Sequence, residues 1–156
     1  MCVPLYKAAM KGDWKAAKVV VDKDPRVVRV RINRKWETAL HIAAAAKRTA
    51  FVKEMVKYMT EEDLALQNKD KNTAICFAAA SGIVEIAEVM VEKNKKLPMI
   101  RGNQGRTPLY MAALFGHREM VSYLYSVTDF GSLARDEKIS LLLGTISADL
   151  YGMMPL

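Results

Sequence analysis

A short motif recurs four times along the 156-residue chain at an almost constant interval. Each copy has one aliphatic residue followed three and four positions later by alanines, and the aliphatic residues are Leu5, Leu40, Ile75 and Leu109. They are spaced 35, 35 and 34 residues apart. Such a period is typical of a stack of similar units, because each unit buries its apolar face against its neighbours. This repeat constrains the possible folds more than any other feature.

Each unit contains two segments with helical periodicity, separated by a turn. Three residues after each alanine pair stands Gly12, Lys47, Gly82 or Gly116. In the segment that follows, apolar residues recur at i, i+1, i+4 and i+5, which places them on one face of a helix. The spacing therefore predicts a short helix, a tight turn, a longer amphipathic helix and an extended connection in every unit.

Turn and cap residues refine this prediction. The hydroxyls of Thr38, Thr73 and Thr107 precede the short helix and are suited to cap it. Glycine takes a left-handed conformation at the turn without strain, whereas Lys47 would do so only at about 1–2 kcal/mol. We therefore expect a locally different turn in the second unit.

The segments 38–44 and 107–113 resemble the ankyrin repeat signature, and the resemblance extends from residue 3 to about residue 127. It implies an all-α solenoid of four repeats and a partial fifth in one domain, residues 1–156. The expected repeats cover about residues 3–32, 33–67, 68–102 and 103–131, with the partial fifth at 138–156. The family resemblance also implies a non-enzymatic scaffold that binds proteins through finger loops and through the concave surface of the first helices.

Two stretches resemble a narrower group, the plant ankyrin proteins that carry a C-terminal multispan membrane domain. They are residues 5–14 and residues 37–43. Members of that group are linked to defence and stress signalling, so the resemblance implies such a role here. Residues 141–151 align with residues 5–15, which predicts the first helix of a fifth repeat. Because this segment lacks the polar outer face of a terminal repeat, we expect the chain to be a fragment or a shortened relative of a longer array.

No motif for phosphate loops, dinucleotides, zinc hydrolases or serine nucleophiles occurs in the sequence. We expect His41 to bond to backbone in its turn and His117 to open a second helix. Cys76 occupies the slot that His41 holds one repeat earlier, so a buried, inert thiol is expected there. A zinc site needs about four ligands, which the cysteine spacing does not offer. We therefore predict no enzyme, no catalytic or metal site and no cofactor.

The predicted fingers are residues 31–37, 67–72 and 101–106. Asn33, Asn68 and Asn103 recur in them at intervals of 35 residues, and asparagine is suited to left-handed turn positions. Trp36 stands where Gly105 stands in the last finger. An exposed tryptophan is typical of a binding hot spot, although it also serves to cover an adjacent turn. The candidate partner-binding residues are Arg34, Lys35, Trp36, Lys69, Lys71, Gln104 and Arg106.

Charge is distributed unevenly along the chain, whose formal net charge is +7. Residues 1–48 hold 12 Lys/Arg and 4 Asp/Glu, a balance of +8, and residues 49–156 hold 12 and 13, a balance of −1. A basic run leads into the first finger: Arg26, Arg29, Arg31, Arg34 and Lys35. It is compatible with a solvated edge, with an acidic protein partner or with anionic lipid heads. Nucleic acid is disfavoured because aliphatic residues, not base-stacking aromatics, separate the charges.

The remaining features concern compartment. Two cysteines are too few to suggest a disulfide framework, and the first residues lack the apolar stretch of a signal peptide. The longest weakly polar stretch, 139–146, is far shorter than the roughly 20 residues that span a bilayer. We therefore predict a cytoplasmic chain without a transmembrane segment, with a full-length form at the cytosolic face of the plasma membrane.

Overall fold

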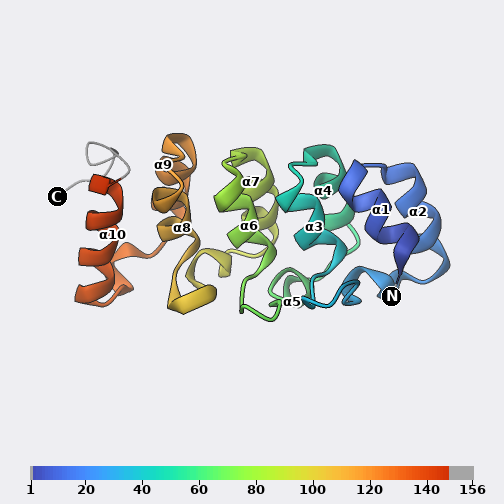
Figure 1. Cartoon of the computed structure of the whole chain (residues 1–156), viewed down its shortest axis with the longest axis horizontal. Helices are drawn as coiled ribbons and strands as arrows, with labels where there is room; N and C mark the ends of the chain where they lie inside the picture. The colour runs from blue at the N-terminus through green and yellow to red at the C-terminus, as the bar shows by residue number, and fades with distance from the viewer. Residues whose placement is uncertain (1, 148–156) are drawn as a thin grey trace.

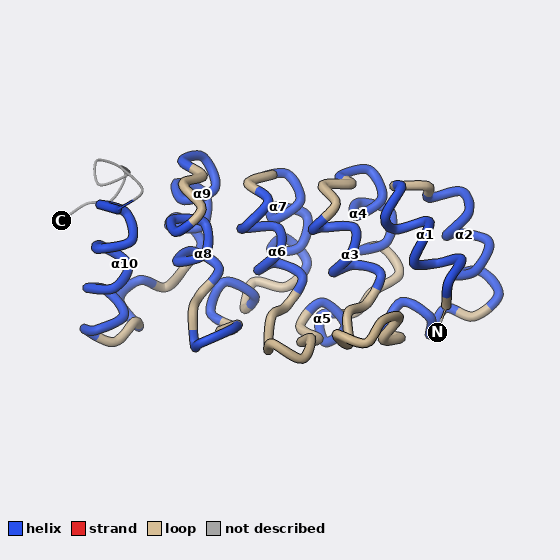
Figure 2. The backbone as a smooth tube through the Cα atoms, viewed as in Figure 1, coloured by secondary structure: helices blue, strands red, loops and turns tan. Residues whose placement is uncertain are grey.

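The computed structural model of the chain describes residues 2–147, and in that range it contains helices and loops but no strand. The helices stand side by side in one elongated row that runs from α1 and α2 to α10 (Figure 1). The connections between successive helix pairs gather along one edge of the row (Figure 2). The predicted all-α solenoid is confirmed.

Most helices occur as pairs joined by a tight turn. The pairs are α1 Val3–Lys11 with α2 Trp14–Lys23, α3 Ala39–Ala45 with α4 Thr49–Val56, α6 Ala74–Ser81 with α7 Val84–Lys93, and α8 Pro108–Leu114 with α9 Arg118–Val127. The other elements are η1 Pro25–Arg29, α5 Glu61–Leu64, η2 Leu97–Met99, η3 Asn103–Gly105, η4 Phe130–Ser132 and α10 Arg135–Ser147. Every pair lies within one of the expected repeats, whose number and bounds stay predictions.

The core is built from contacts between neighbouring pairs. Helices α1, α3, α6, α8 and α10 contact one another in that order, and α4 contacts α7 behind them. The second alanine of each motif, Ala9, Ala44, Ala79 and Ala113, is fully buried. Because these residues have no side chain beyond Cβ, adjacent first helices approach closely, and the row becomes one continuous core.

The turn in the second unit is not different, so that expectation was wrong. Lys47 has a φ of 62°, close to the 74° of Gly12, the 78° of Gly82 and the 74° of Gly116. The lysine therefore adopts the left-handed conformation that glycine takes elsewhere, in spite of the steric cost of its Cβ.

Two of the turn glycines are also required by a side chain from the next unit. A Cβ on Gly12 would lie 2.9 Å from the Arg48 side chain, and one on Gly82 would lie 2.6 Å from Nδ1 of His117. Arg48 Nε donates to the carbonyl of Met10 at 2.9 Å, and Nε2 of His117 bonds to the carbonyl of Ala80 at 2.8 Å. His117 is the N-cap of α9, as expected.

The three threonines begin their helices in different ways. The hydroxyl of Thr107 accepts from the N–H of Tyr110 at 3.2 Å, as predicted for a cap. Thr38 forms a capping box with His41, in which its hydroxyl also bonds to Nδ1 of His41 at 2.9 Å. The hydroxyl of Thr73 contacts the sulfur of Cys76 at 3.6 Å. The residue in the third helical position therefore decides what the hydroxyl binds.

Helix α10 takes the place of the next first helix in the row, since it packs against α8. Within it Leu141 and Thr145 are buried, whereas Leu143 and Ile146 are exposed. The same pattern holds in α1, where residues 5 and 9 are buried and residues 7 and 10 are exposed. The helix begins at Arg135, three residues before the expected start of the partial fifth repeat at residue 138. The rest of the predicted partial repeat, residues 148–156, lies outside the described residues.

Candidate protein-binding surface

Each predicted finger is a closed loop. We call residues 31–37 the first finger, 67–72 the second and 101–106 the third. A backbone hydrogen bond closes each loop at its base: Ile32 N–H to Glu37 C=O at 2.8 Å, Asn68 N–H to Asn72 C=O at 2.9 Å, and Gly102 N–H to Arg106 C=O at 2.8 Å. The fingers therefore present their tips at the edge of the row (Figure 1).

Asparagine side chains shape the first two fingers from inside. Oδ1 of Asn33 accepts from the N–H groups of Lys35 and Glu37, both at 3.0 Å. Oδ1 of Asn68 accepts at the same two offsets, from residues 70 and 72, again at 3.0 Å. Asn103 does not repeat this role, because it lies four residues before its threonine, whereas Asn33 and Asn68 lie five residues before theirs. Its N–H donates instead to Oδ1 of Asn72, at 2.8 Å.

The left-handed positions fall elsewhere, so the expectation that asparagines occupy them was wrong. Two residues before each threonine φ is positive: 63° at Trp36, 67° at Lys71 and 70° at Gly105. Gln104 has a φ of 58°. Trp36 and Gly105, which occupy equivalent positions in the sequence, therefore also share the same left-handed backbone conformation.

The fingers are linked to one another. Lys69 N–H donates to Lys35 C=O at 2.9 Å, and the guanidinium of Arg31 donates to Gln67 C=O. The side chain of Gln67 in turn donates to Arg101 C=O at 3.1 Å. These bonds connect the three fingers, which lie about 35 residues apart in sequence, along one edge of the row of helices.

Trp36 lies at the tip of the first finger with 53% of its surface exposed. Two cations flank its ring: Arg31 Cζ is 5.8 Å and Lys69 Nζ 5.5 Å from the ring centroid. Each such contact contributes about 0.5–1 kcal/mol at an exposed site. The ring thus packs on the neighbouring finger and still presents half its area to a partner, which combines both sequence interpretations.

The structure divides the basic run. Arg26 pairs with Asp24 at 2.9 Å, and Arg29 pairs with the buried carboxylate of Asp63 at 3.2 Å. The guanidinium of Arg31 donates to two backbone carbonyls, those of Trp36, at 3.0 Å, and Gln67. Arg34 and Lys35 are exposed and have no ion-pair partner among the described residues. These two members of the run are therefore free of intramolecular ion pairs, whereas Arg26 and Arg29 are paired but keep exposed side chains.

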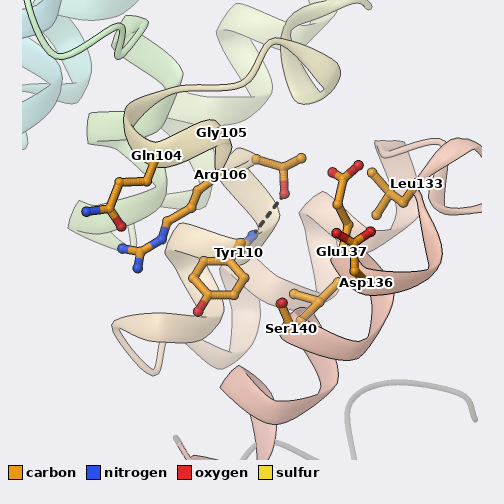
Figure 3. Close-up of a pocket in the computed structure, with 10 residues that line it drawn as sticks. Gln104, Gly105, Arg106, Tyr110, Leu133, Asp136, Glu137 and Ser140 are labelled. Carbon is orange, nitrogen blue, oxygen red and sulfur yellow. Dashed lines mark hydrogen bonds between the residues drawn. The ribbon is translucent and has the colours of Figure 1, made fainter.

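The other four candidate partner-binding residues also lie in two different places. Lys69 and Lys71 are exposed on the second finger, and Lys69 joins Trp36. Gln104 and Arg106 instead line a pocket of about 330 Å³ toward α10. In Figure 3, Arg106 and Gln104 lie on one side of this pocket and the acidic residues of α10 on the other. Arg106 stacks over Tyr110, with Cζ 5.1 Å from the ring centroid.

Sequence reasoning missed the acidic wall of this pocket, Asp136 and Glu137. Both carboxylates of the wall come from the part of α10 that precedes the aligned segment 141–151. Glu137 forms a two-pronged ion pair with Arg101, at 2.7 and 2.8 Å. No local motif predicts the pair of Arg101 and Glu137. The one signal in the sequence is their separation of 36 residues, about one repeat, which is compatible with a salt bridge between neighbouring repeats.

Two titratable side chains of the first helices, His41 and Cys76, are buried. His41 accepts the Thr38 N–H at 3.1 Å through Nδ1, and its Nε2 bonds to Asn72 C=O at 3.0 Å, which confirms the expected backbone bonding. Burial lowers its pKa. Cys76 is buried, as expected, and burial raises the pKa of its thiol. That the thiol is inert stays a prediction, which the raised pKa favours because the thiolate is the reactive form.

Residues 2–147 hold no group of three or more His, Cys, Asp or Glu side chains arranged to bind a metal. No helix in this range is long and apolar enough to cross a bilayer.

Comparison with known proteins agrees with the geometry. A family model described as ankyrin repeats (3 copies) matches residues 45–132. A relative from Oryza sativa subsp. japonica, "Probable E3 ubiquitin-protein ligase XBOS31", is 29% identical over 115 residues, which is 74% of this chain and 25% of the relative. In Arabidopsis thaliana, "E3 ubiquitin-protein ligase XBAT32" is 28% identical over 142 residues (88% and 28%). "Protein ACCELERATED CELL DEATH 6" from the same plant is 26% identical over 140 residues (80% and 21%).

These three relatives are plant proteins, as the narrower resemblance implied. The chain spans between about a fifth and somewhat more than a quarter of their length. The matched family model covers more than half of the chain, over α4 to η4. From its helix pairs, linked fingers and sequence match, the chain belongs to the ankyrin repeat family.

Proposed function

We propose that this chain is a recognition module that binds an acidic segment of a protein partner along the edge of its first and second fingers. Ankyrin repeats are a non-catalytic fold that serves protein–protein interaction, so the chain itself is not assigned a reaction. Trp36 is the proposed anchor, and the surrounding lysines, Lys35, Lys69 and Lys71, are the proposed electrostatic contacts.

The observation that carries this proposal is the state of Trp36. Its backbone is held in a left-handed conformation, which costs a residue with a Cβ about 1–2 kcal/mol, and half of the ring is exposed. Strained positions that expose a large aromatic side chain are typical of binding sites. The basic side chains around it would speed association with an acidic partner and would set its orientation.

The test is affinity capture from a plant cell extract followed by binding measurements with the purified partner. Trp36→Ala should remove the main partners and weaken the purified one by about thirtyfold, the effect of a hot-spot residue worth about 2 kcal/mol. Phe115→Ala is the matched control, since Phe115 is equally exposed but lies at the turn after α8. Identical partners for wild type and Trp36→Ala would contradict the proposal.

We further propose that the chain acts in the cytoplasm, in plant defence or stress signalling. The names of the plant relatives refer to ubiquitin ligation and to cell death, and both kinds of protein are several times longer than this chain. The array would then supply partner recognition within such a system.

A second candidate function is the regulatory array of a membrane-anchored protein whose basic end contacts anionic lipid. The observation in its favour is that Arg34 and Lys35 are free and adjacent on the first finger. Binding to phosphatidylserine vesicles, lost at high salt and in Arg34→Glu/Lys35→Glu, would support it. Equal binding to neutral phosphatidylcholine vesicles would contradict it.

A further inference from the structure

The second and third fingers each use one N–H in a fixed position to reach the finger before them. That N–H lies four residues before the threonine at the start of the next helix. In the second finger it is Lys69, which donates to Lys35 C=O at 2.9 Å. In the third it is Asn103, which donates to Oδ1 of Asn72 at 2.8 Å.

In the same two fingers, the C=O two residues before that N–H also points toward the preceding finger. Gln67 C=O accepts from the guanidinium of Arg31, and Arg101 C=O accepts from the Gln67 side chain at 3.1 Å. In the first finger the equivalent groups are Arg34 N–H and Ile32 C=O. Neither has a hydrogen-bond partner among the described residues. The first finger thus presents an unpaired donor and acceptor two residues apart, like the edge of a strand.

These two free groups lie beside a groove between α1 and the first finger, at the end of the row that carries α1 (Figure 1). The groove has a volume of about 610 Å³. On the α1 side it is lined by Val3, Tyr6 and Lys7, and Val3 exposes 45% of its surface. On the finger side it is lined by residues 32–35 and 37.

The rim of the groove is basic. Lys7, Arg34 and Lys35 have no ion-pair partner among the described residues. The one carboxylate of the groove, Glu37, accepts from Nδ2 of Asn33 at 2.6 Å. An apolar floor, an unpaired backbone edge and a cationic rim fit one kind of occupant, an extended chain with alternating apolar and acidic side chains.

We propose that the groove binds an extended acidic segment of a partner protein, which pairs its backbone with Arg34 N–H and Ile32 C=O. One apolar side chain of the segment packs against Val3 and Tyr6. Its flanking carboxylates meet the three basic side chains of the rim. This site lies on the face of the first finger opposite the second finger and shares only Lys35 with the fingertip surface proposed above.

The test uses the full chain, labelled with ¹⁵N, and the peptide acetyl-Glu-Asp-Val-Glu-Val-Asp-Glu-amide. The expected result is saturable binding in which the Arg34 amide signal shifts and its hydrogen exchange slows. A peptide with lysine at the acidic positions should not bind, and one with N-methylated valines should bind at least about tenfold more weakly. No saturable binding, or an unchanged Arg34 amide, would overturn the proposal.

Val3→Asp is the decisive variant. It places a carboxylate in the groove but also in the first turn of α1, where the helix dipole favours it, so folding is preserved. Affinity for the peptide should fall by at least about tenfold through charge repulsion. Val19→Asp, on the exposed face of α2 where Val19 is 58% exposed, is the matched control and should bind normally.

Two outcomes would overturn the proposal, because they would assign the peptide to another site or the groove to another occupant. Loss of peptide binding in Trp36→Ala would place the peptide at the fingertips, so that variant must keep its affinity for the peptide. A dimer in sedimentation that Val3→Asp dissociates would make a second copy of this chain the occupant of the groove.

Discussion

Residues with a side chain at left-handed backbone positions mark places where this fold accepts local strain. Within residues 2–147 they are Trp36, Lys47, Lys71 and Gln104. Three of them lie in fingers, where the conformation shapes the proposed binding edge. Lys47 is the exception, because it lies in an interhelix turn whose counterparts are all glycines. Its strain therefore has no evident role in the finger surface.

Lys47→Gly should raise the free energy of unfolding by about 1 kcal/mol, since glycine takes this φ without a steric penalty. Urea denaturation measures the change. Lys15→Gly is the control: Lys15 is exposed in α2, where glycine should lower stability by about 0.5–1 kcal/mol. If both variants were destabilised equally, the turn strain inferred for Lys47 would be absent.

The buried imidazole of His41 should make stability depend on pH. Burial lowers its pKa in the folded chain below the ordinary value of 6.5. The unfolded chain therefore binds a proton first as pH falls. The stabilisation is fully present above about pH 6.5 and is lost progressively below it, until pH reaches the folded-state pKa.

The expected loss from this residue between pH 7.5 and 5.5 is at most about 1.4 kcal/mol, the equivalent of one pH unit below the unfolded pKa. His41→Gln, which keeps an amide donor toward Asn72 C=O, should remove that part of the slope. Unfolding curves of the two proteins at both pH values give the difference. Parallel pH profiles would show that His41 titrates equally in both states.

At the scale of elements, each finger depends on how its inner polar groups are satisfied. Asn33 and Asn68 each accept two backbone N–H groups, whereas no such pair of turn bonds involves Asn103. Asn33→Ala and Asn68→Ala should therefore each lower the free energy of unfolding by about 1–3 kcal/mol, because N–H groups lose their acceptor. Asn103→Ala should change it by less than about 0.5 kcal/mol.

Thermal or urea unfolding of the three variants is a matched comparison, since the residues are spaced 35 positions apart. Equal losses at all three positions would mean that the asparagines share a role that the hydrogen bonds do not describe.

The helices were predictable from sequence because their determinants are local: apolar spacing, alanine pairs and turn residues. The finger geometry was not, because its bonds join residues far apart, such as Arg31 and Gln67. A count of charges predicted a basic run, but it could not reveal that Arg29 pairs with Asp63, 34 residues away. The 34-residue spacing from Thr73 to Thr107 also misled the prediction for Asn103. It places this asparagine one position closer to its threonine than Asn33 and Asn68 are to theirs.

For the candidate site, exposure of the seven residues was largely foreseen, but their grouping was not. Trp36 joins Lys69 because the first two fingers are linked, whereas Arg106 turns to Tyr110 and the pocket beside α10. The acidic residues of that pocket lie before the aligned part of α10. Only the three-dimensional stacking of repeats places them opposite the third finger.

At the scale of the whole molecule, charge changes along the row of helices. The basic excess belongs to residues 1–48, which form α1 to α3, whereas residues 49–156 hold 12 Lys/Arg and 13 Asp/Glu and are nearly neutral. The two ends of one scaffold therefore offer different chemistry to partners. Such a division is straightforward in a solenoid, because each helix pair contacts only its neighbours.

The same architecture predicts that core damage stays local. Leu40 in α3 and Leu109 in α8 are equivalent, buried leucines, and replacing either with alanine should lower stability by about 2–5 kcal/mol. Hydrogen exchange followed by mass spectrometry should then differ between the variants. Leu40→Ala should accelerate exchange most in α1, α3 and α6, and Leu109→Ala most in α6, α8 and α10, because stability is transmitted through adjacent interfaces. If both variants accelerated exchange equally along the whole chain, the row would unfold as one cooperative unit instead.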